Sequence, residues 1–311
     1  MALEKSYNCI WAKNDIIILG ITMPVSMLYK TYSSVLNHYQ QISKSKKSIT
    51  KFAIEKTVIL LVTILQLTSG IKFPKRSIGG WWWTWRIRFE IITGFFDYYV
   101  SEYCQQLIKP GMIVVDIGAH VGYYTWLFSK LVGPSGKVIS YEPSPENFQI
   151  LVQNLRAKNI NNVIPIQKAV CDCSKPVKLY LSPGNSNHSI VKGFTNFEDV
   201  IEVAATTIDL GVKELGYAKL DFIKIDAEGA EPAILRGMSS ILKESEEAIL
   251  IIEMNPFALR ASSFNPADLI EQLSYLNFDP KIILVDGSLS TDFSSFYDHT
   301  VNLLCLQKVE L

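Results

Sequence analysis

Short apolar runs alternate with segments of helical periodicity through the last two thirds of the chain. The runs predict seven strands, at residues 113–117, 137–142, 162–170, 221–226, 248–253, 281–285 and 301–308. Apolar residues at helical spacing predict helices in most of the gaps, at residues 122–132, 145–158, 231–243 and 266–277. Strands that alternate with helices need crossover connections, so the pattern predicts an α/β fold with a seven-stranded, mostly parallel sheet and helices on both faces.

Two segments depart from this alternation. Between Cys171 and Ala205, the runs KLYLS and VIEVAAT flank the turn-rich PGNSNHS, which predicts a hairpin or flap added to the sheet. The pair Asp286-Gly287 lies between the last two predicted strands. A tight return there makes the final strand antiparallel to its neighbour.

Residues 1–95 have a different pattern, which predicts a mostly helical extension to a domain at residues 96–311. Two uncharged apolar segments, Ile16 to Tyr29 and Thr57 to Ile71, hold 14 and 15 residues, and the first contains Pro24. Both are shorter than the ~20 residues of a membrane-spanning helix. We therefore expect this extension to pack on the main domain.

The alternative for the extension is a peripheral contact with a membrane surface. The residues suited to it are the aromatic cluster WWWTW, from Trp81 to Trp85, and the basic residues Lys44, Lys46 and Lys47. A secretory signal fits poorly, because Glu4 precedes the first apolar segment and no small-residue cleavage site follows it.

The composition suits a globular protein with a sizeable core, because 48% of the 311 residues are apolar. Lys and Arg number 30 against 30 Asp and Glu, which disfavours a nucleic-acid partner because phosphate binding uses clustered basic residues. The five cysteines are odd in number and scattered, which fits reduced thiols in the cytoplasm. Cys171 and Cys173 form only a CxC, too little for a zinc site by itself.

The first candidate site is the stretch VVDIGAHVGYYT, from Val114 to Thr125. Asp116 lies at the end of a predicted strand, and Gly118 and Gly122 follow in the turn before a predicted helix. Glycine permits left-handed backbone angles and lets a ligand approach the bare main chain. The N–H groups of the helix and the Asp116 carboxylate therefore flank a site for one small polar molecule.

A second acid, Glu142, ends the next predicted strand, where ligands bind in open α/β sheets. Its two oxygens suit the two hydroxyls of a ribose; alternatively, its charge favours the start of the helix near Pro145. A dinucleotide fits poorly, because its fingerprint needs glycine where this turn has His120 and Tyr123. A nucleoside with an amino-acid tail, such as S-adenosylmethionine, needs a less close approach, and its ammonium group suits Asp116.

The stretch KIDAEGAE, from Lys224 to Glu231, holds three carboxylates directly after a predicted buried strand. Acids beside a strand end indicate a site, because unpaired charges are costly to bury there. Alternatively, Glu228 and Glu231 are solvated residues in the first turn of the helix near Pro232. Asp226, at the strand end itself, fits this alternative less well.

Taken together, six segments resemble the FkbM-type family of S-adenosylmethionine-dependent methyltransferases. They are VVDIGAHVGYYT, YEPSPENF, QKAVCD, TTIDL, IKIDAEGAEPAILRG and IIEMN, in this order between about Glu90 and Leu306. The KIDAEGAE block is the most specific, and nothing before residue 85 resembles the family. The resemblance implies a class I methyltransferase fold, which is Rossmann-like, with S-adenosylmethionine as cofactor.

The resemblance also implies which residues bind the cofactor. They are Asp116, Gly118, Ala119, His120, Gly122, Tyr123, Glu142, Pro143, Ala169, Val170, Asp172 and Asp226. By this resemblance, the glycine turn surrounds the methionine part and Glu142 binds the ribose. Asp172, or the backbone near Ala169 and Val170, then lies beside the adenine. His120 stands where the family often has Asn, which alters a hydrogen bond but keeps the glycine turn.

Methyl transfer is an in-line displacement at an activated carbon, so the protein mainly aligns donor and acceptor. The family implies a hydroxyl acceptor, whose proton must pass to a base within hydrogen-bond distance. The candidate bases are Asp226, Glu228, Glu253 and His188. Asp226 or Glu228 is preferred, because a lone loop histidine is more often structural. Alternatively, the acids gather a divalent metal that lowers the pKa of the acceptor; our expectation is a site without a metal.

The sequence therefore predicts a methyltransferase that acts on a hydroxyl of a sugar, a glycolipid or another small metabolite, without a nucleic-acid partner. We expect it in the cytoplasm, associated with a membrane if the extension binds there. The alternative function is a peripheral membrane protein with a degenerate, non-catalytic methyltransferase domain. The intact glycine turn and acid cluster argue against it.

Overall fold

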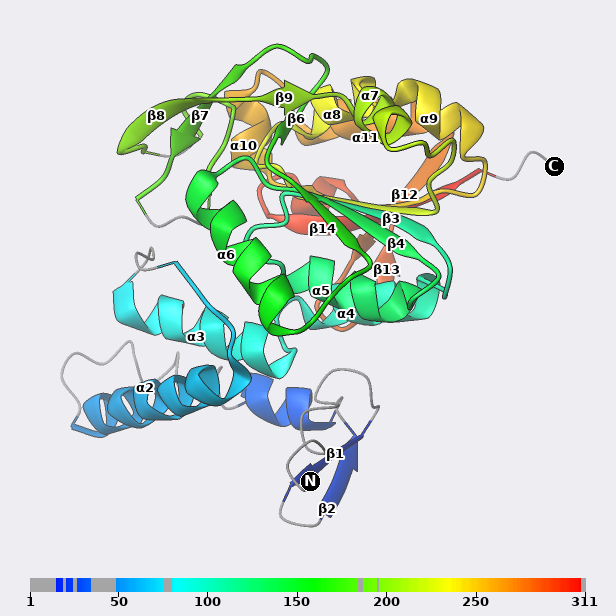
Figure 1. Ribbon diagram of the computed structural model, residues 1–311. Helices are drawn as coiled ribbons and strands as arrows, with labels where there is room; N and C mark the ends of the chain where they lie inside the picture. The colour runs from blue at the N-terminus through cyan, green and yellow to red at the C-terminus, as the bar shows by residue number, and fades with distance from the viewer. Residues whose placement is uncertain are drawn as a thin grey trace. The chain divides into compact units, whose positions relative to one another are not determined.

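The computed structural model describes residues 15–18, 21–24, 27–34, 49–74, 80–183, 187–194 and 196–308. Contacts within the chain divide it into two compact units (Figure 1). The first unit comprises Met1–Ile71 and Gly79–Tyr98, and the second comprises Lys72–Ile78 and Tyr99–Leu311. Most contacts of each unit lie within that unit.

In the first unit, the described residues form a strand pair and helices. Strands β1 (Asp15–Ile18) and β2 (Ile21–Pro24) pair antiparallel. Residues 27–34 are helical, and two longer helices follow, α2 (Ile49–Ser69) and α3 (Gly80–Thr93). The first apolar segment thus begins as strands within the expected helical extension, because its run of β-branched isoleucines favours the pleated conformation.

Aromatic rings pack together within this unit. The rings of Tyr29 and Tyr98 stack with their centroids 4.1 Å apart, and the rings of Tyr32 and Phe95 lie 5.3 Å apart. The Tyr32 hydroxyl donates a hydrogen bond to Glu90 at 2.7 Å. These contacts join the helical residues 27–34 to the end of the unit.

Among the described residues, no helix has the length and apolar character needed to cross a membrane. The basic residues Lys44, Lys46 and Lys47, which the sequence suggests for a membrane contact, lie outside the described residues.

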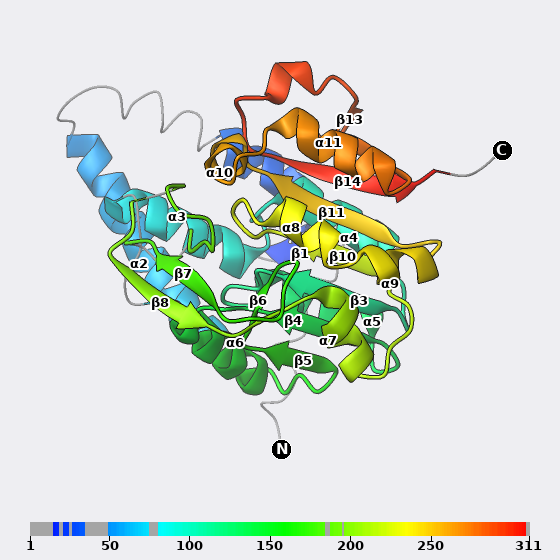
Figure 2. The same ribbon diagram turned by 90° about the horizontal axis from the view of Figure 1, so that it is seen from above.

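The second unit is built on an eight-stranded mixed sheet (Figures 1 and 2). In order across the sheet, its strands are β13 (Leu289–Ser290), β12 (Phe278–Ile283), β14 (Val301–Gln307), β11 (Ile249–Met254), β10 (Phe222–Ile225), β3 (Ile113–Ile117), β4 (Lys137–Tyr141) and β5 (Val163–Ile166). Strands β11, β10, β3, β4 and β5 run parallel, and β14 is antiparallel to β11 and β12. The predicted mostly parallel sheet with an antiparallel final strand is confirmed.

The sheet has one strand more than the seven that the sequence predicts. The additional strand, β13, has two residues and pairs antiparallel with the end of β12. The turn at Gly287 therefore leads into β13 and not directly into the final strand β14, which corrects the prediction. A strand of two residues is too short to leave a periodic pattern.

The helices from α4 onward are α4 (Tyr98–Leu107), α5 (Tyr123–Val132), α6 (Pro145–Ala157), α7 (Ile208–Glu214), α8 (Glu231–Arg236), α9 (Ser239–Glu244), α10 (Pro256–Ala261), α11 (Pro266–Tyr275) and the 3-10 helix η1 (Ser294–Phe296). In Figure 1, α4 and α5 lie below the sheet, and α7, α8, α9 and α11 lie above it. Between these layers, Val115, Ile139 and Ile223 of neighbouring strands are fully buried. Burial on both faces explains why the strands read as continuous apolar runs.

Two predicted elements are interrupted. The predicted helix at residues 231–243 is split into α8 and α9 around Gly237, where an added Cβ would lie 2.2 Å from the carbonyl oxygen of Cys171. The predicted strand at residues 162–170 leaves the sheet after Ile166, and β6 (Ala169–Val170) pairs instead with β9 (Ala205–Thr206). Both breaks come from contacts with distant parts of the chain.

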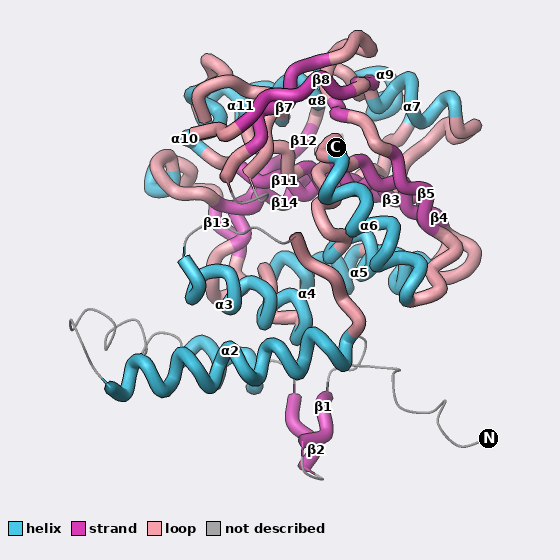
Figure 3. The backbone as a smooth tube through the Cα atoms, turned by 60° about the vertical axis from the view of Figure 1, so that its left-hand side comes forward, coloured by secondary structure: helices cyan, strands magenta, loops and turns pink. Residues whose placement is uncertain are grey.

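The inserted segment forms the predicted hairpin. Strands β7 (Val177–Leu181) and β8 (Asp199–Val203) pair antiparallel in a sheet of their own (Figure 3). Leu179 and Val203 pack with Ala169 and Cys171 in a small apolar cluster. The base of the hairpin is thereby attached to β6.

Candidate active site

The carboxyl ends of four neighbouring strands place acids at one edge of the sheet. Asp116 lies on β3 and Glu253 on β11, whereas Glu142 follows β4 and Asp226 follows β10. Strand β3 pairs with both β4 and β10, so the strand order reverses at β3. Ligands bind at such a switch point in open α/β sheets. The structure thus brings together the acids that the sequence singles out.

The turn after β3 has the left-handed backbone that glycine favours. Gly118 and Gly122 have φ angles of 82° and 94°, and His120 has a φ of 50°. The N–H groups of Gly118 and Ala119 both donate to the carbonyl oxygen of Tyr141, each at 3.0 Å. The turn is therefore tied to the end of β4.

The two glycines also have a packing role that the sequence did not reveal. A Cβ on Gly118 would lie 1.8 Å from the carbonyl oxygen of Asp226, so the turn meets the end of β10 through bare backbone. A Cβ on Gly122 would lie 2.6 Å from a methyl carbon of Leu151 on α6. The glycines therefore set how closely β10 and α6 approach the turn.

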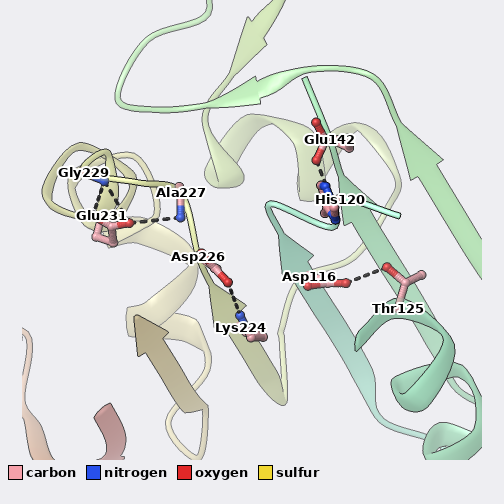
Figure 4. A network of polar contacts seen from close by, with 9 residues as sticks. All are labelled: Asp116, His120, Thr125, Glu142, Lys224, Asp226, Ala227, Gly229 and Glu231. Carbon is pink, nitrogen blue, oxygen red and sulfur yellow. Dashed lines mark hydrogen bonds and ion pairs between the residues drawn. The ribbon is translucent and has the colours of Figure 1, made fainter. Parts of the chain in front are cut away.

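Asp116, just before this turn, is almost fully buried, with 2% of its surface exposed. Its Oδ2 accepts a hydrogen bond from the Thr125 hydroxyl of α5 at 2.5 Å (Figure 4). Burial raises the pKa of Asp116 to about 6, against the opposing effects of Lys224 and Thr125. At neutral pH this carboxyl is therefore mostly ionised and suits a cationic ligand group.

Glu142 links the glycine turn to the start of α6. Its Oε2 accepts the N–H of His120 at 2.8 Å (Figure 4). Its Oε1 accepts the N–H of Ser144, the N-cap residue of α6, at 2.9 Å. Burial raises the pKa of Glu142 to about 7, although both N–H groups lower it. The Asn147 side chain also bonds to this carboxylate, so three of its four lone pairs are used and one is left for a further donor. The contact with the helix start and the predicted contact with a ribose are therefore compatible.

Lys224 is a member of the site that the sequence analysis missed. It lies on β10 with 1% of its surface exposed, and its Nζ is 2.9 Å from Oδ2 of Asp226 (Figure 4). The Nζ also lies 4.4 Å from the centroid of the Tyr124 ring. A lysine inside a predicted buried strand was itself an indication, because lysine is almost never fully buried unless it is paired.

Glu231 holds the loop between β10 and α8. It is 1% exposed, and its carboxylate accepts the N–H of Ala227 at 3.0 Å and the N–H of Gly229 at 2.9 Å (Figure 4). Burial raises the pKa of Glu231 to about 7, although these N–H groups lower it. The alternative of a solvated first-turn residue is therefore wrong for Glu231, which supports the loop from inside.

This loop presents Glu228 in a left-handed conformation, with a φ of 51°. Asn255 donates to Oε2 of Glu228 at 3.2 Å, and the Ser189 hydroxyl donates to its carbonyl oxygen at 2.7 Å. Burial and the neighbouring Asp226 raise the pKa of Glu228 well above its usual value. Glu228 is therefore protonated more readily than an exposed glutamate.

Two groups of side chains converge within the described residues. One consists of Asp226, Glu228 and Glu253, and the other of Cys171, Asp172 and Cys173; in each group the ligand atoms lie within 4.8 Å of one another. The Sγ atoms of the two cysteines are 3.4 Å apart. Three carboxylates at this spacing suit either a proton acceptor or a cation site. The absence of a metal stays a prediction.

His188 lies between β7 and β8, and its Nδ1 accepts the backbone N–H of Ser182 at 3.0 Å. Because a backbone N–H only donates, the neutral ring carries its proton on Nε2. Burial, assisted by His120, lowers the pKa of His188 to about 4, so the ring is neutral at pH 7. A neutral ring with this tautomer is better suited to donate a hydrogen bond than to act as the predicted base.

The predicted adenine-side residues lie on and after β6. Ala169 and Val170 are buried, with 2% and 5% of their surfaces exposed. Asp172 is partly exposed and forms an ion pair with Arg236 at 2.8 Å. The backbone of β6 and the Asp172 side chain are thus held in place by different parts of the chain.

The last predicted cofactor residues flank the two strand ends. Ala119 is buried in the glycine turn, and Pro143 is half-buried between Glu142 and α6. Tyr123 begins α5 and shares a hydrogen bond with the Ser101 hydroxyl at 3.0 Å.

Comparison with known proteins identifies a family and distant relatives. The family profile described as "Methyltransferase FkbM domain" matches residues 116–280, which are more than half of the 311 residues. Methyltransferase 1 of Beauveria bassiana is 28% identical over 145 residues, which are 40% of this chain and 57% of that protein. Hexuronic acid methyltransferase AglP of Haloferax volcanii is 23% identical over 172 residues, which are 55% of this chain and 64% of that protein. The alignments thus span less than two thirds of either relative.

Among solved structures, an O-methyltransferase from Bacillus cereus in complex with SAH is similar to this chain. The alignment covers 90% of this chain and 100% of that chain, with 13% sequence identity and a TM-score of 0.44.

Proposed function

Because this chain belongs to the FkbM methyltransferase domain family, we propose that it transfers a methyl group from S-adenosylmethionine to a hydroxyl of a sugar, a glycolipid or another small metabolite. Family membership makes it a methyltransferase that uses S-adenosylmethionine; the acceptor and the atom methylated are the proposed part. The relative from Haloferax volcanii is named for a hexuronic acid, and this name supports an acceptor of the sugar class.

The observation that carries the proposal is the site formed by Asp116, the glycine turn and Glu142 at the strand switch point. Asp116 would bind the ammonium group of the cofactor, and the remaining lone pair of Glu142 would accept a hydrogen bond from its ribose. The turn from Gly118 to Gly122 would hold the methionine part. The backbone of β6 and Asp172 would hold the adenine.

In the reaction, the acceptor oxygen attacks the methyl carbon in line with the breaking carbon–sulfur bond. The electron pair of that bond stays on sulfur, which gives S-adenosylhomocysteine, and the hydroxyl proton passes to Asp226. Asp226 suits this role because Lys224 binds its Oδ2 while 30% of its side chain is exposed. Glu228 suits it less, because its Oε2 already accepts a hydrogen bond from Asn255.

Replacing Glu142 with Gln is expected to weaken the binding of S-adenosylhomocysteine by about tenfold or more. The glutamine amide has only one acceptor oxygen, so its NH2 group would face the N–H of His120 or of Ser144. Isothermal titration calorimetry measures the affinity, and the rise in the thermal midpoint with ligand gives an independent value. Glu271→Gln, an exposed change on α11, is the matched control.

The outcomes of this experiment separate two claims. If the folded wild-type protein binds neither S-adenosylmethionine nor S-adenosylhomocysteine, the proposed function fails and the degenerate, non-catalytic alternative is left. If wild type binds and Glu142→Gln binds equally well, only the ribose role of Glu142 is removed.

A peripheral membrane contact of the N-terminal unit is a second proposal, because α2 exposes large apolar side chains. Leu60, Leu61, Ile64 and Leu67 are 61%, 52%, 49% and 79% exposed. Their spacing places them along one side of the helix. A helix of this kind can bury its apolar side in the headgroup region of a bilayer without crossing it.

A variant that carries both Leu61→Gln and Leu67→Gln is expected to lose about tenfold in binding to phosphatidylserine-containing vesicles, because each change removes buried apolar area at the interface. Vesicle flotation measures the bound fraction. Tyr275→Gln, which changes an 89% exposed ring on α11, is the control. Equal flotation of wild type and the double variant would count against the contact.

A further inference from the structure

Lys224 is the only buried lysine or arginine among the described residues, with 1% of its surface exposed. It lies opposite Asp116 in the parallel pairing of β10 with β3. Its Nζ is 2.9 Å from Oδ2 of Asp226 and 4.4 Å from the centroid of the Tyr124 ring. The ammonium group is thus enclosed by two aspartates and an aromatic face that come from three elements of the fold.

A buried ammonium group needs anionic partners, and two neighbouring carboxylates repel each other unless a cation lies beside them. The groups that face Lys224 are Asp116 from β3, Tyr124 from α5, Asp226 after β10 and Glu253 from β11. Although burial opposes it, Asp226 and Asp116 raise the pKa of Lys224, so the ammonium group keeps its charge. Further acids near the two aspartates are Glu142, whose pKa Asp116 raises, and Glu228 and Glu231, whose pKa values Asp226 raises.

We propose that Lys224 is a positioning residue of the active site: it is the counter-ion that Asp116 and Asp226 share, and it fixes the orientation of Asp226. The ammonium group binds Oδ2 of Asp226. Within the described part of the chain, Oδ1 of this residue has no hydrogen-bond partner, and the side chain is 30% exposed. One oxygen is therefore fixed by Lys224, and the other is presented to the reacting molecules.

This inference rests on the proposed function, because it assigns Asp116 to the cofactor and Asp226 to the acceptor. Without the ammonium group, the repulsion between the two aspartates is relieved by the uptake of a proton. The cationic cofactor then binds a site that already carries that proton. Cofactor binding in such a variant is coupled to proton release at a pH where the wild type releases little.

The test compares wild type with Lys224→Met, which keeps most of the side-chain volume and removes the charge. Binding of S-adenosylmethionine and of S-adenosylhomocysteine is measured by calorimetry in two buffers of different ionisation enthalpy, between about pH 6 and pH 9, which gives the number of protons released. We expect the pH of half-maximal release to rise by about one to three units in Lys224→Met.

Two further variants act as controls. Lys224→Arg keeps the positive charge and is expected to retain a proton-release curve close to that of wild type. Lys281→Met removes a partly exposed lysine that also pairs with an aspartate two residues away, Asp279. It is expected to leave the proton-release curve unchanged. A proton-release curve of Lys224→Met that superimposes on that of wild type overturns the inference and leaves the proposed function intact. A wild type without affinity for either compound overturns the proposed function.

If Lys224→Met does not fold, the stability of a double variant tests the counter-ion role instead. A counter-ion role predicts that the double variant Lys224→Met with Asp226→Asn is more stable than the single variant, because the uncompensated charge beside the buried Asp116 is removed. Urea unfolding shows whether the double variant regains a cooperative transition that the single variant lacks. A double variant no more stable than the single variant contradicts the counter-ion role.

Discussion

Replacing Asp226 with Asn is expected to lower methyl transfer by about 10²- to 10⁴-fold, which is the usual contribution of a general base. The change keeps the shape of the side chain and an oxygen that can accept from Lys224, so binding of S-adenosylhomocysteine is expected to stay near the wild-type value. The measurement is incubation with labelled cofactor and a glycan and lipid extract, followed by mass analysis of the methylated product.

The matched control for this prediction is Asp279→Asn on β12. Asp279 also pairs with a lysine two residues away, Lys281 at 3.3 Å, but it is half exposed and lies outside the site. Turnover in Asp279→Asn is expected to equal that of wild type. Turnover in Asp226→Asn equal to that of wild type would remove Asp226 from the mechanism and leave Glu253 and Glu228 as the acids to test.

Replacing Gly118 with Ala is expected to lower the free energy of unfolding by about 2–5 kcal/mol and to abolish cofactor binding. The new Cβ would lie 1.8 Å from the carbonyl oxygen of Asp226, so the turn and the end of β10 must move apart. The φ of 82° adds the strain of an alanine in the left-handed region. Urea unfolding measures the stability, and calorimetry with S-adenosylhomocysteine measures the binding.

Gly133→Ala separates the two causes. Gly133 also has a positive φ, of 64°, but a Cβ there would have no heavy atom within 4 Å. Its substitution is expected to cost about 1–3 kcal/mol from backbone strain alone and to leave cofactor binding unchanged. Equal losses in the two variants would mean that backbone strain, and not the contact with Asp226, explains the effect at Gly118.

The sequence by itself determined the sheet, the glycine turn and the acids at the strand ends. The runs at residues 113–117 and 137–142 match β3 and β4 to within one residue, because buried parallel strands appear as short, continuous apolar segments. The KIDAEGAE block and the glycine turn are each an unbroken stretch of sequence, so the family was evident without coordinates. The family profile confirms it. These features depend on residues that are neighbours in the chain.

Only the tertiary structure decided which partners these residues have. Gly118 meets the backbone of Asp226, and Lys224 lies opposite Asp116, although 108 positions separate each pair in the chain. Local spacing allowed Glu231 to be a solvated residue. In the structure it is buried and accepts hydrogen bonds from two backbone N–H groups. Burial and the compensation of charge depend on how distant strands pack together, and local apolar periodicity carries no information about that packing.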